Sequence, residues 1–240
     1  MTEDRIGILG IDSLHFFVRD LARSCAHYGQ RLGFVERALS GPEFVFAHGM
    51  RAALLAAGDV CFLFLSPESR DSECARWLCL HPEGLGRVVF QVEDIERAYR
   101  VLRARGATPI SGIEQGELSD GTVRWFDIAT PLGDTSFRFV QRRGARGMFP
   151  GLIRHPGRRG RAGNRFGVLG IDHLTSNFLT LGPALAWMEQ VLGFERYWGI
   201  EFHTQDVHAE LDGGSGLKSV VMWDPVSGIK LANNEPAAPA

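Results

Sequence analysis

The stretch RIGILGIDSL at Arg5–Leu14 recurs as RFGVLGIDHL at Arg165–Leu174, 160 residues further along the chain. The same offset places Leu32-Gly33-Phe34 on Leu192-Gly193-Phe194 without a gap. Over the first 32 aligned positions 13 residues are identical, which unrelated segments rarely reach in ungapped register. We interpret the two stretches as an internal duplication, and a repeat of this kind determines how the rest of the chain is divided.

Each copy begins with the pattern of a strand, a helix and a second strand. Apolar runs at Ile8–Val18 and Val168–Phe178 predict the first strands. Helical spacing then predicts helices at Leu21–Arg31 and Pro183–Val191, each ended by a glycine with a left-handed backbone, Gly33 or Gly193. The first copy continues with predicted strands at Glu43–Ala47, Ala52–Ala57 and Val60–Leu65.

A weaker echo of the same unit lies inside the first half. Gly86–Val92 predicts a strand and Asp94–Arg105 a helix, followed by strands at Val123–Ile128 and Thr135–Gln141. The expected fold class is therefore α+β, built from repeated βαβββ modules. Residues 1–142 would form a domain of two modules, and residues 165–240 a third module that is half of a second domain.

Residues 143–164 connect these parts and are rich in Arg, Gly and Pro, which predicts an interdomain linker. Its arginines are interleaved with one aromatic residue, Phe149, so the stretch does not match a nucleic-acid-binding surface.

The whole chain of 240 residues is 45% hydrophobic and 22% charged with a formal charge of −2, which is typical of a soluble globular protein. That charge provides no overall field to attract nucleic acid or anionic membrane.

The chain shows no targeting or membrane-spanning pattern. No apolar run reaches the roughly 20 residues that a membrane helix needs, and the opening MTEDRIG lacks a basic region followed by an apolar one. We therefore expect a cytoplasmic protein without a membrane partner.

The four cysteines form no C-x-x-C pair and are interpreted as reduced thiols: Cys25, Cys61, Cys74 and Cys79.

Four stretches carry a resemblance to a known family: Ile171-Asp172-His173-Leu174, the FHTQDV segment at 202–207, Ser219, and Asn233-Asn234-Glu235-Pro236. With them the chain resembles the 4-hydroxyphenylpyruvate dioxygenases of the vicinal oxygen chelate superfamily. The resemblance implies βαβββ modules paired into half-open barrels. It also implies a metal-free N-terminal domain and a catalytic domain whose non-haem Fe(II) is held by two His and one Glu.

The resemblance also assigns residues and a reaction. His173 matches the first iron ligand, and Ser219 and Asn234 match polar groups that line the substrate pocket. The implied reaction converts 4-hydroxyphenylpyruvate, a 2-oxo acid, and O2 to homogentisate and CO2 in tyrosine catabolism. A sister activity, 4-hydroxymandelate synthase, starts from the same substrate and is an alternative that these residues do not separate. Ala232 departs from the family, in which many members have proline.

The offset of the repeat predicts where the other two iron ligands would lie in the sequence. Its offset places Ser13 opposite His173, and alignment with the family strands places Arg87 and Arg138 where the second His and the Glu belong. These residues are not ligands for Fe(II), since guanidinium offers no lone pair and repels the cation. Counterparts in the second domain are expected near positions 247 and 298, outside these 240 residues. One ligand of three is therefore present, and we expect no family reaction from this chain alone.

Three hypotheses follow for the chain. It is a truncated dioxygenase, or a separate polypeptide supplies the fourth module, or it is a non-catalytic binding or structural paralogue that pairs with another copy as a homo-oligomer. A free third module would expose a sheet edge and an apolar face, which favours association. A local metal site at His203, His208, Glu201 and Glu210 is a further alternative, but its spacing matches no established template.

Overall fold

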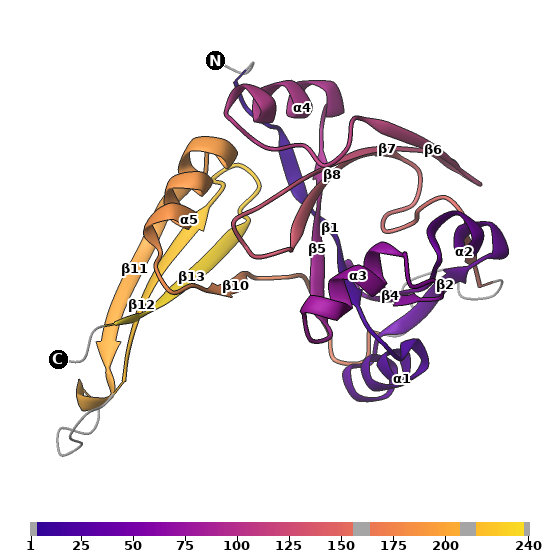
Figure 1. The fold of residues 1–240 in the computed structure, drawn as a ribbon, viewed down its shortest axis with the longest axis horizontal. Helices are drawn as coiled ribbons and strands as arrows, with labels where there is room; N and C mark the ends of the chain where they lie inside the picture. Colours follow the sequence, from indigo (N-terminus) through magenta and orange to yellow (C-terminus); the bar gives the residue numbers. More distant parts are fainter. Residues whose placement is uncertain (1–3, 156–163, 207–214, 238–240) are drawn as a thin grey trace.

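The computed structural model describes residues 4–155, 164–206 and 215–237. They form a nine-stranded sheet in the order β6-β7-β8-β5-β1-β4-β3-β2-β9 and a four-stranded sheet in the order β10-β13-β12-β11 (Figure 1). The strands are β1 (Ile8–Phe17), β2 (Val35–Ser40), β3 (Met50–Ala57), β4 (Val60–Pro67), β5 (Gly84–Val92), β6 (Glu114–Leu118), β7 (Gly121–Ile128), β8 (Ser136–Arg143), β9 (Leu152–Arg154), β10 (Leu174–Asn177), β11 (Glu195–His203), β12 (Gly216–Trp223) and β13 (Lys230–Ala237). The helices are α1 (Leu21–Leu32), α2 (Pro42–His48), α3 (Glu73–Leu80), α4 (Ile95–Ala104) and α5 (Gly182–Trp187), and a π-helical turn at Met188–Leu192 continues α5.

Three modules repeat one sheet topology. In each, the first strand pairs in parallel with the last, and the strand order is first, last, third, second: β1-β4-β3-β2, β5-β8-β7-β6 and β10-β13-β12-β11. The first two modules join because β1 and β5 pair antiparallel. The predicted α+β fold of repeated βαβββ modules is confirmed.

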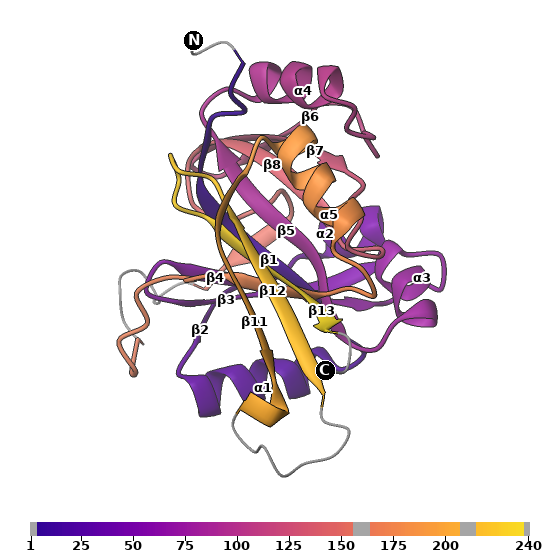
Figure 2. The same cartoon turned by 90° about the vertical axis from the view of Figure 1, so that its left-hand side faces the viewer.

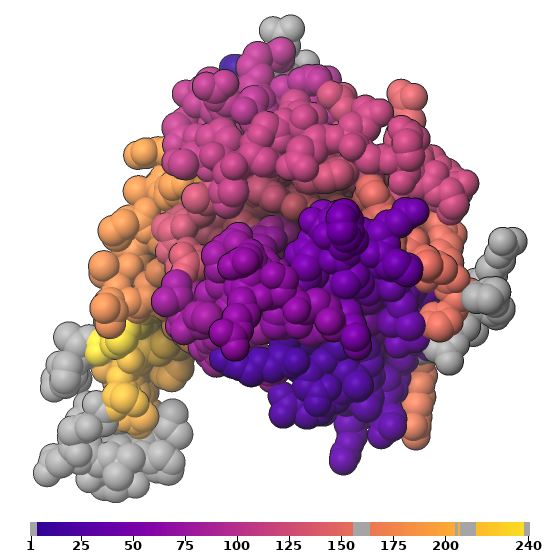
Figure 3. All heavy atoms as spheres, turned by 45° about the vertical axis from the view of Figure 1, so that its right-hand side comes forward, coloured from indigo at the N-terminus to yellow at the C-terminus, as the bar shows by residue number. Residues whose placement is uncertain are grey.

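The buried core has two main parts, one between the first two modules and one between the second module and the third. Apolar side chains of the first and second modules meet in one buried cluster that includes Leu54, Leu63, Val89 and Val140. On the outer face of the second module, α4 and the third module share another buried cluster, in which Phe137 lies 6.0 Å from the ring of Trp187. The third module therefore packs on the outside of the first domain, as the side view and the space-filling view show (Figures 2 and 3).

Two predicted strands differ from the structure. Glu43–Ala47, predicted as a strand, lies in helix α2, because Pro42 occupies the first turn and Gly49 ends the helix with φ 60°. The helix buries Phe44 and leaves Phe46 95% exposed. The two aromatic residues are two positions apart, which is also the spacing of side chains on one face of a strand. In the third module, β10 begins at Leu174 and not at Val168.

The short β10 has a physical reason in the repeat. In the first copy, residues 8–13 belong to β1 because they pair with β5, from Ile8 with Val92 to Ser13 with Val89. Among the described residues, β13 is the one strand that pairs with β10, and that pairing covers 174–177. Without a second neighbour the preceding residues do not complete a ladder.

The N-terminal part of the predicted linker is folded onto the first domain. Leu152–Arg154 form β9, which pairs with β2, and Met148 and Phe149 are each 5% exposed within the core of that domain. Residues 156–163 lie outside the described residues. The boundary between linker and second domain at 164 and 165 therefore stays a prediction.

The glycine that ends α1 provides a test of local backbone control. Gly33 has φ 70°, whereas Gly29 lies inside α1 and a Cβ added there would meet only ordinary contacts. We expect Gly33→Ala to destabilise the protein by about 1 kcal/mol, because an L residue is strained at this φ. We expect Gly29→Ala to stabilise it by up to about 1 kcal/mol through helix propensity. Urea unfolding of both variants measures these changes. Equal changes in the free energy of unfolding would contradict the left-handed conformation of Gly33.

Candidate functional site

The third module brings Ser219 and Asn234 together. They are direct partners in the antiparallel pair of β12 and β13, so their side chains lie on the same face of the sheet. The Asn234 side-chain amide donates to Asn177 Oδ1 on β10 at 3.0 Å, which orients it along the sheet. Ser219 is buried, with 7% exposure. The structure thus places the two sequence-predicted substrate residues side by side.

An apolar surface adjoins this pair on β11. Trp198 and Ile200 pair in register with Val221 and Ser219, so they share the face that carries Ser219. They are 50% and 48% exposed, and Phe202 on the same strand is 42% exposed. Large apolar side chains at such exposure on one face of a sheet are typical of a binding or association surface.

The repeat shows what this face does in the first domain. Trp198 corresponds to Ala38 and His173 to Ser13 at the same offset of 160 residues. Ala38 and Ser13 are both 0% exposed, because the second module covers the first. The side chain of His173 is 49% exposed. The third module therefore presents the face that a partner module covers in the first domain.

His173 immediately precedes β10, four residues before Asn177. Its Nδ1 lies 2.7 Å from Asp172 Oδ2, and Asp172 also accepts from Lys230 Nζ at 3.3 Å. The hydrogen bonds from His173 and Lys230 hold the pKa of the Asp172 carboxyl below its usual range. When Nδ1 carries the proton toward Asp172, Nε2 presents its lone pair, which is the arrangement that a carboxylate enforces on a metal-binding imidazole.

The donor set around His173 does not fit a resident iron. Over the described parts of the chain, no group of three His, Cys, Asp or Glu side chains is placed to hold a metal ion. Asp172 is engaged with His173 itself, and Ser219 and Asn234 are not strong ligands for Fe(II). His208 and Glu210 of the alternative local cluster lie outside the described residues, and His203 Nε2 is 3.8 Å from Glu201 Oε1.

In the first domain the three positions aligned with the family's ligands lie on neighbouring strands. Arg138 forms a bidentate pair with Asp127 on β7, from Nε to Oδ1 and from Nη2 to Oδ2, each at 2.7 Å. Arg87 Nε lies 3.6 Å from the same carboxylate. Burial raises the pKa of Asp127, but Arg87 and Arg138 outweigh it and hold that pKa below its usual value. Ser13 donates its hydroxyl proton to Asp12 Oδ2 at 3.0 Å.

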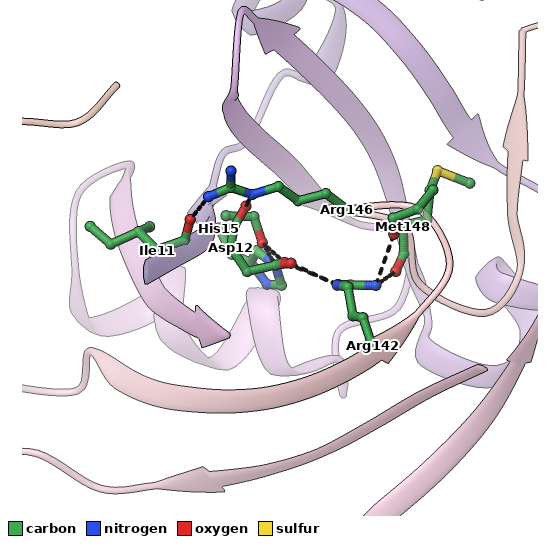
Figure 4. Close-up of polar contacts among 8 residues, drawn as sticks. Ile11, Asp12, His15, Arg142, Arg146 and Met148 are labelled. Atoms are coloured by element: carbon green, nitrogen blue, oxygen red, sulfur yellow. Dashed lines mark hydrogen bonds and ion pairs between the residues drawn. The ribbon is translucent and has the colours of Figure 1, made fainter. Parts of the chain in front are cut away.

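Sequence reasoning missed several residues of this interior. Asp127 and His15 face it from β7 and β1, and Asp12 forms a buried pair with Arg142 at the end of β8 (Figure 4). The Arg142 side chain donates from Nε to Asp12 Oδ1 at 2.7 Å and from Nη2 to Oδ2 at 3.0 Å. An Arg within a predicted strand indicates that a carboxylate lies nearby, because a buried guanidinium needs a partner. Which carboxylate it is depends on strand pairing, which the sequence does not give.

Comparison with known proteins places the chain in a family. A family model described as the Glyoxalase/Bleomycin resistance protein/Dioxygenase superfamily matches residues 10–133, just over half of the chain. The chain belongs to this superfamily. Within the superfamily it is similar to 4-hydroxyphenylpyruvate dioxygenases. It is 29% identical to that of Dictyostelium discoideum over 95% of this chain and 62% of the relative. It is also 29% identical to that of Caenorhabditis elegans over 95% of this chain and 58% of the relative.

A solved structure of similar fold is that of a mutant of 4-hydroxymandelate synthase from Streptomyces coelicolor. Its TM-score is 0.79 at 18% identity, over 96% of this chain and 63% of that chain. This superfamily member thus spans about three fifths of the length of the relatives it matches. No described helix is both long and apolar enough to cross a membrane.

The cysteines are free, as the sequence analysis predicts. Burial raises the pKa of the Cys61 thiol to about 11 and that of Cys74 to about 12. Both thiols therefore stay protonated near neutral pH and are poor nucleophiles.

Proposed function

We propose that this superfamily member is part of an Fe(II)-dependent dioxygenase that acts on 4-hydroxyphenylpyruvate or a related 2-oxo acid with O2. It supplies the metal-free first domain and the first half of the catalytic barrel. In this proposal His173 is one of three iron ligands, and the other His and the Glu come from a fourth module that these 240 residues do not contain. The fourth module belongs to a longer form of the protein or to a separate chain.

One observation carries the proposal. The third module repeats the topology of the first, yet Trp198 and the His173 side chain are half exposed where Ala38 and Ser13 are fully buried by a second module. A module that covers this face would bury the apolar side chains of β11 and bring its own strands beside His173. The similarity to 4-hydroxyphenylpyruvate dioxygenases over 95% of the chain supports the same completed arrangement.

Ser219 and Asn234 would orient the substrate in that arrangement. Asn234 pairs with Asn177, which follows His173 by four residues, or about 13 Å at the rise of a β-strand. A substrate held at its 2-oxo acid beside His173 would therefore reach toward the Ser219 and Asn234 pair with its other end. Groups so placed act by positioning and not by proton transfer.

The test is complementation. The purified chain is assayed for iron content and for 4-hydroxyphenylpyruvate-dependent oxygen uptake, alone and coexpressed with the remaining C-terminal segment of the Dictyostelium discoideum dioxygenase. We expect neither iron nor uptake from the chain alone, and both from the combination. Stoichiometric iron with turnover by the chain alone would show that other residues complete the site and would overturn the proposal.

A non-catalytic paralogue that pairs with a second copy is the competing function, and the same half-exposed face on β11 favours it. Two copies would contribute His173 twice but no Glu from the family position. A stable dimer without iron, unaffected by the coexpressed segment, would support this second function. Analytical ultracentrifugation of the chain with and without the segment distinguishes the two.

A further inference from the structure

The first domain contains a cavity of about 280 Å³ between its two modules, separate from the open face of the third module. Its walls are mostly apolar and aromatic, and its far end carries charged groups from the sheet. The volume approaches that of small-molecule sites, which combine apolar walls with a few convergent polar groups. The apolar lining includes Phe44, Met50, Leu63, Leu65, Trp125 and Phe149.

The charged end contains two guanidiniums that retain hydrogen-bonding capacity. Arg138 donates from Nε and Nη2 to Asp127, and Arg87 donates from Nε to Ser136 Oγ at 3.2 Å and from Nη2 to Glu73. Within the described parts of the chain, these bonds leave Nη1 of each guanidinium for another acceptor. Arginine is suited to a carboxylate acceptor because its donors are fixed in a plane.

The balance of buried charge favours an anion. Three arginines face this interior, whereas two carboxylates, Asp12 and Asp127, are fully enclosed with them. Two further carboxylates line the cavity at its exposed side: Glu73, whose side chain is 42% exposed and contacts Arg87, and Glu114. An incoming carboxylate would replace Glu73 as the partner of Arg87. The three arginines are Arg87, Arg138 and Arg142.

His15 supplies the second, independent observation. It is 1% exposed, lines the cavity, and pairs in register with Arg87 across β1 and β5. Its Nδ1 has no hydrogen-bond partner among the described residues. Burial and the three nearby arginines hold its pKa well below the usual value, so the ring is neutral.

The hydrogen bonds of Ser13 determine which nitrogen is free to accept. The single hydroxyl proton of Ser13 goes to Asp12, so its oxygen accepts from His15 Nε2 at 3.3 Å (Figure 4 shows His15 beside Asp12). Nε2 then carries the proton of the neutral ring, and Nδ1 presents a lone pair. A ligand here needs a hydrogen-bond donor close to its carboxylate.

We propose that the cavity of the first domain binds a small 2-hydroxy carboxylate with an aromatic or apolar body. The carboxylate lies against Arg87 and Arg138, the hydroxyl donates to His15 Nδ1, and the body packs against the apolar wall that Trp125 and Phe149 form together. Non-covalent binding at this site is independent of iron and of the proposed dioxygenase function.

Calorimetric titration of the full chain with mandelate tests the proposal. We expect one mandelate per chain, binding about tenfold weaker for phenylacetate, which lacks the hydroxyl, and no binding of mandelamide, which lacks the charge. Absence of mandelate binding up to about 10 mM would overturn the proposal. Equal affinity for mandelamide or for inorganic phosphate would overturn it as well, because the site would then not recognise this class of ligand.

Two variants locate the site. Glu73→Gln removes the competing carboxylate at the entrance, and we expect it to tighten mandelate binding severalfold; Glu96→Gln, in an exposed pair with Arg124, is the matched control and changes nothing. His15→Leu should remove the preference for mandelate over phenylacetate. If Glu73→Gln leaves the affinity for mandelate unchanged, and circular dichroism shows that this variant is folded, mandelate binds elsewhere and the proposal is wrong.

Discussion

We expect the replacement of Asp12 by asparagine to lower the free energy of unfolding by about 3–5 kcal/mol. The Asp12 side chain is 0% exposed and that of Arg142 is 3% exposed, and the two form a bidentate pair. Asparagine keeps the shape but removes the charge, so the guanidinium stays buried without its counter-charge. Most of the expected loss is the cost of that uncompensated cation and not the value of the pair itself.

The consequence extends beyond one ion pair because Arg142 connects distant segments. It also donates to the backbone carbonyls of Ala145 and Met148, and Arg146 donates to the carbonyl of Asp12 at 3.2 Å. The segment after β8 is thereby attached to β1. We expect Asp12→Asn to release this segment as well as to weaken the domain, which limited proteolysis reports.

Urea unfolding followed by circular dichroism measures the change. The control is Asp120→Asn, whose partner Arg154 and own side chain are 43% and 45% exposed. An exposed pair contributes less than about 1 kcal/mol, so this variant should unfold close to the wild type. Similar losses in the two variants would contradict the importance of burial at Asp12.

If the proposed complementation restores activity, we expect His173→Ala to remove iron binding and to lower the rate of oxygen uptake by more than about 100-fold. Two remaining ligands do not define the facial geometry that leaves positions open for substrate and O2. Asp172→Asn should weaken iron binding by about 10- to 100-fold, because it removes the negative charge that holds the Nδ1 proton and makes the imidazole a stronger ligand. Iron content and oxygen uptake are measured on the same preparations.

His27→Ala is the control for this series, because His27 is an exposed residue of α1 in the first domain. We expect it to retain iron and activity. Retained turnover in His173→Ala would show that this imidazole is not a ligand. A loss of activity with iron still bound would assign His173 to substrate binding instead.

Local pattern predicted much of the fold correctly. Gly33 and Gly193 end their helices with φ 70° and 72°, as the repeated Leu-Gly-Phe predicts, because only glycine adopts this backbone without strain. The sequence failed at Glu43–Ala47, where aromatic residues in a short amphipathic helix imitate strand alternation. It also failed at Val168–His173, where no described strand completes the ladder.

Four features could be predicted from the amino-acid sequence: the repeat, the module type, the glycine helix ends and the position of His173 within its copy. These features depend on neighbouring residues or on direct comparison of two stretches. Three features required the folded structure: Arg87 and Arg138 share Asp127, Asp12 pairs with Arg142, and His15 lines a cavity with Nδ1 unpartnered among the described residues. The physical reason is that partners of buried charges are selected by strand pairing between segments far apart in the chain, which no local pattern records.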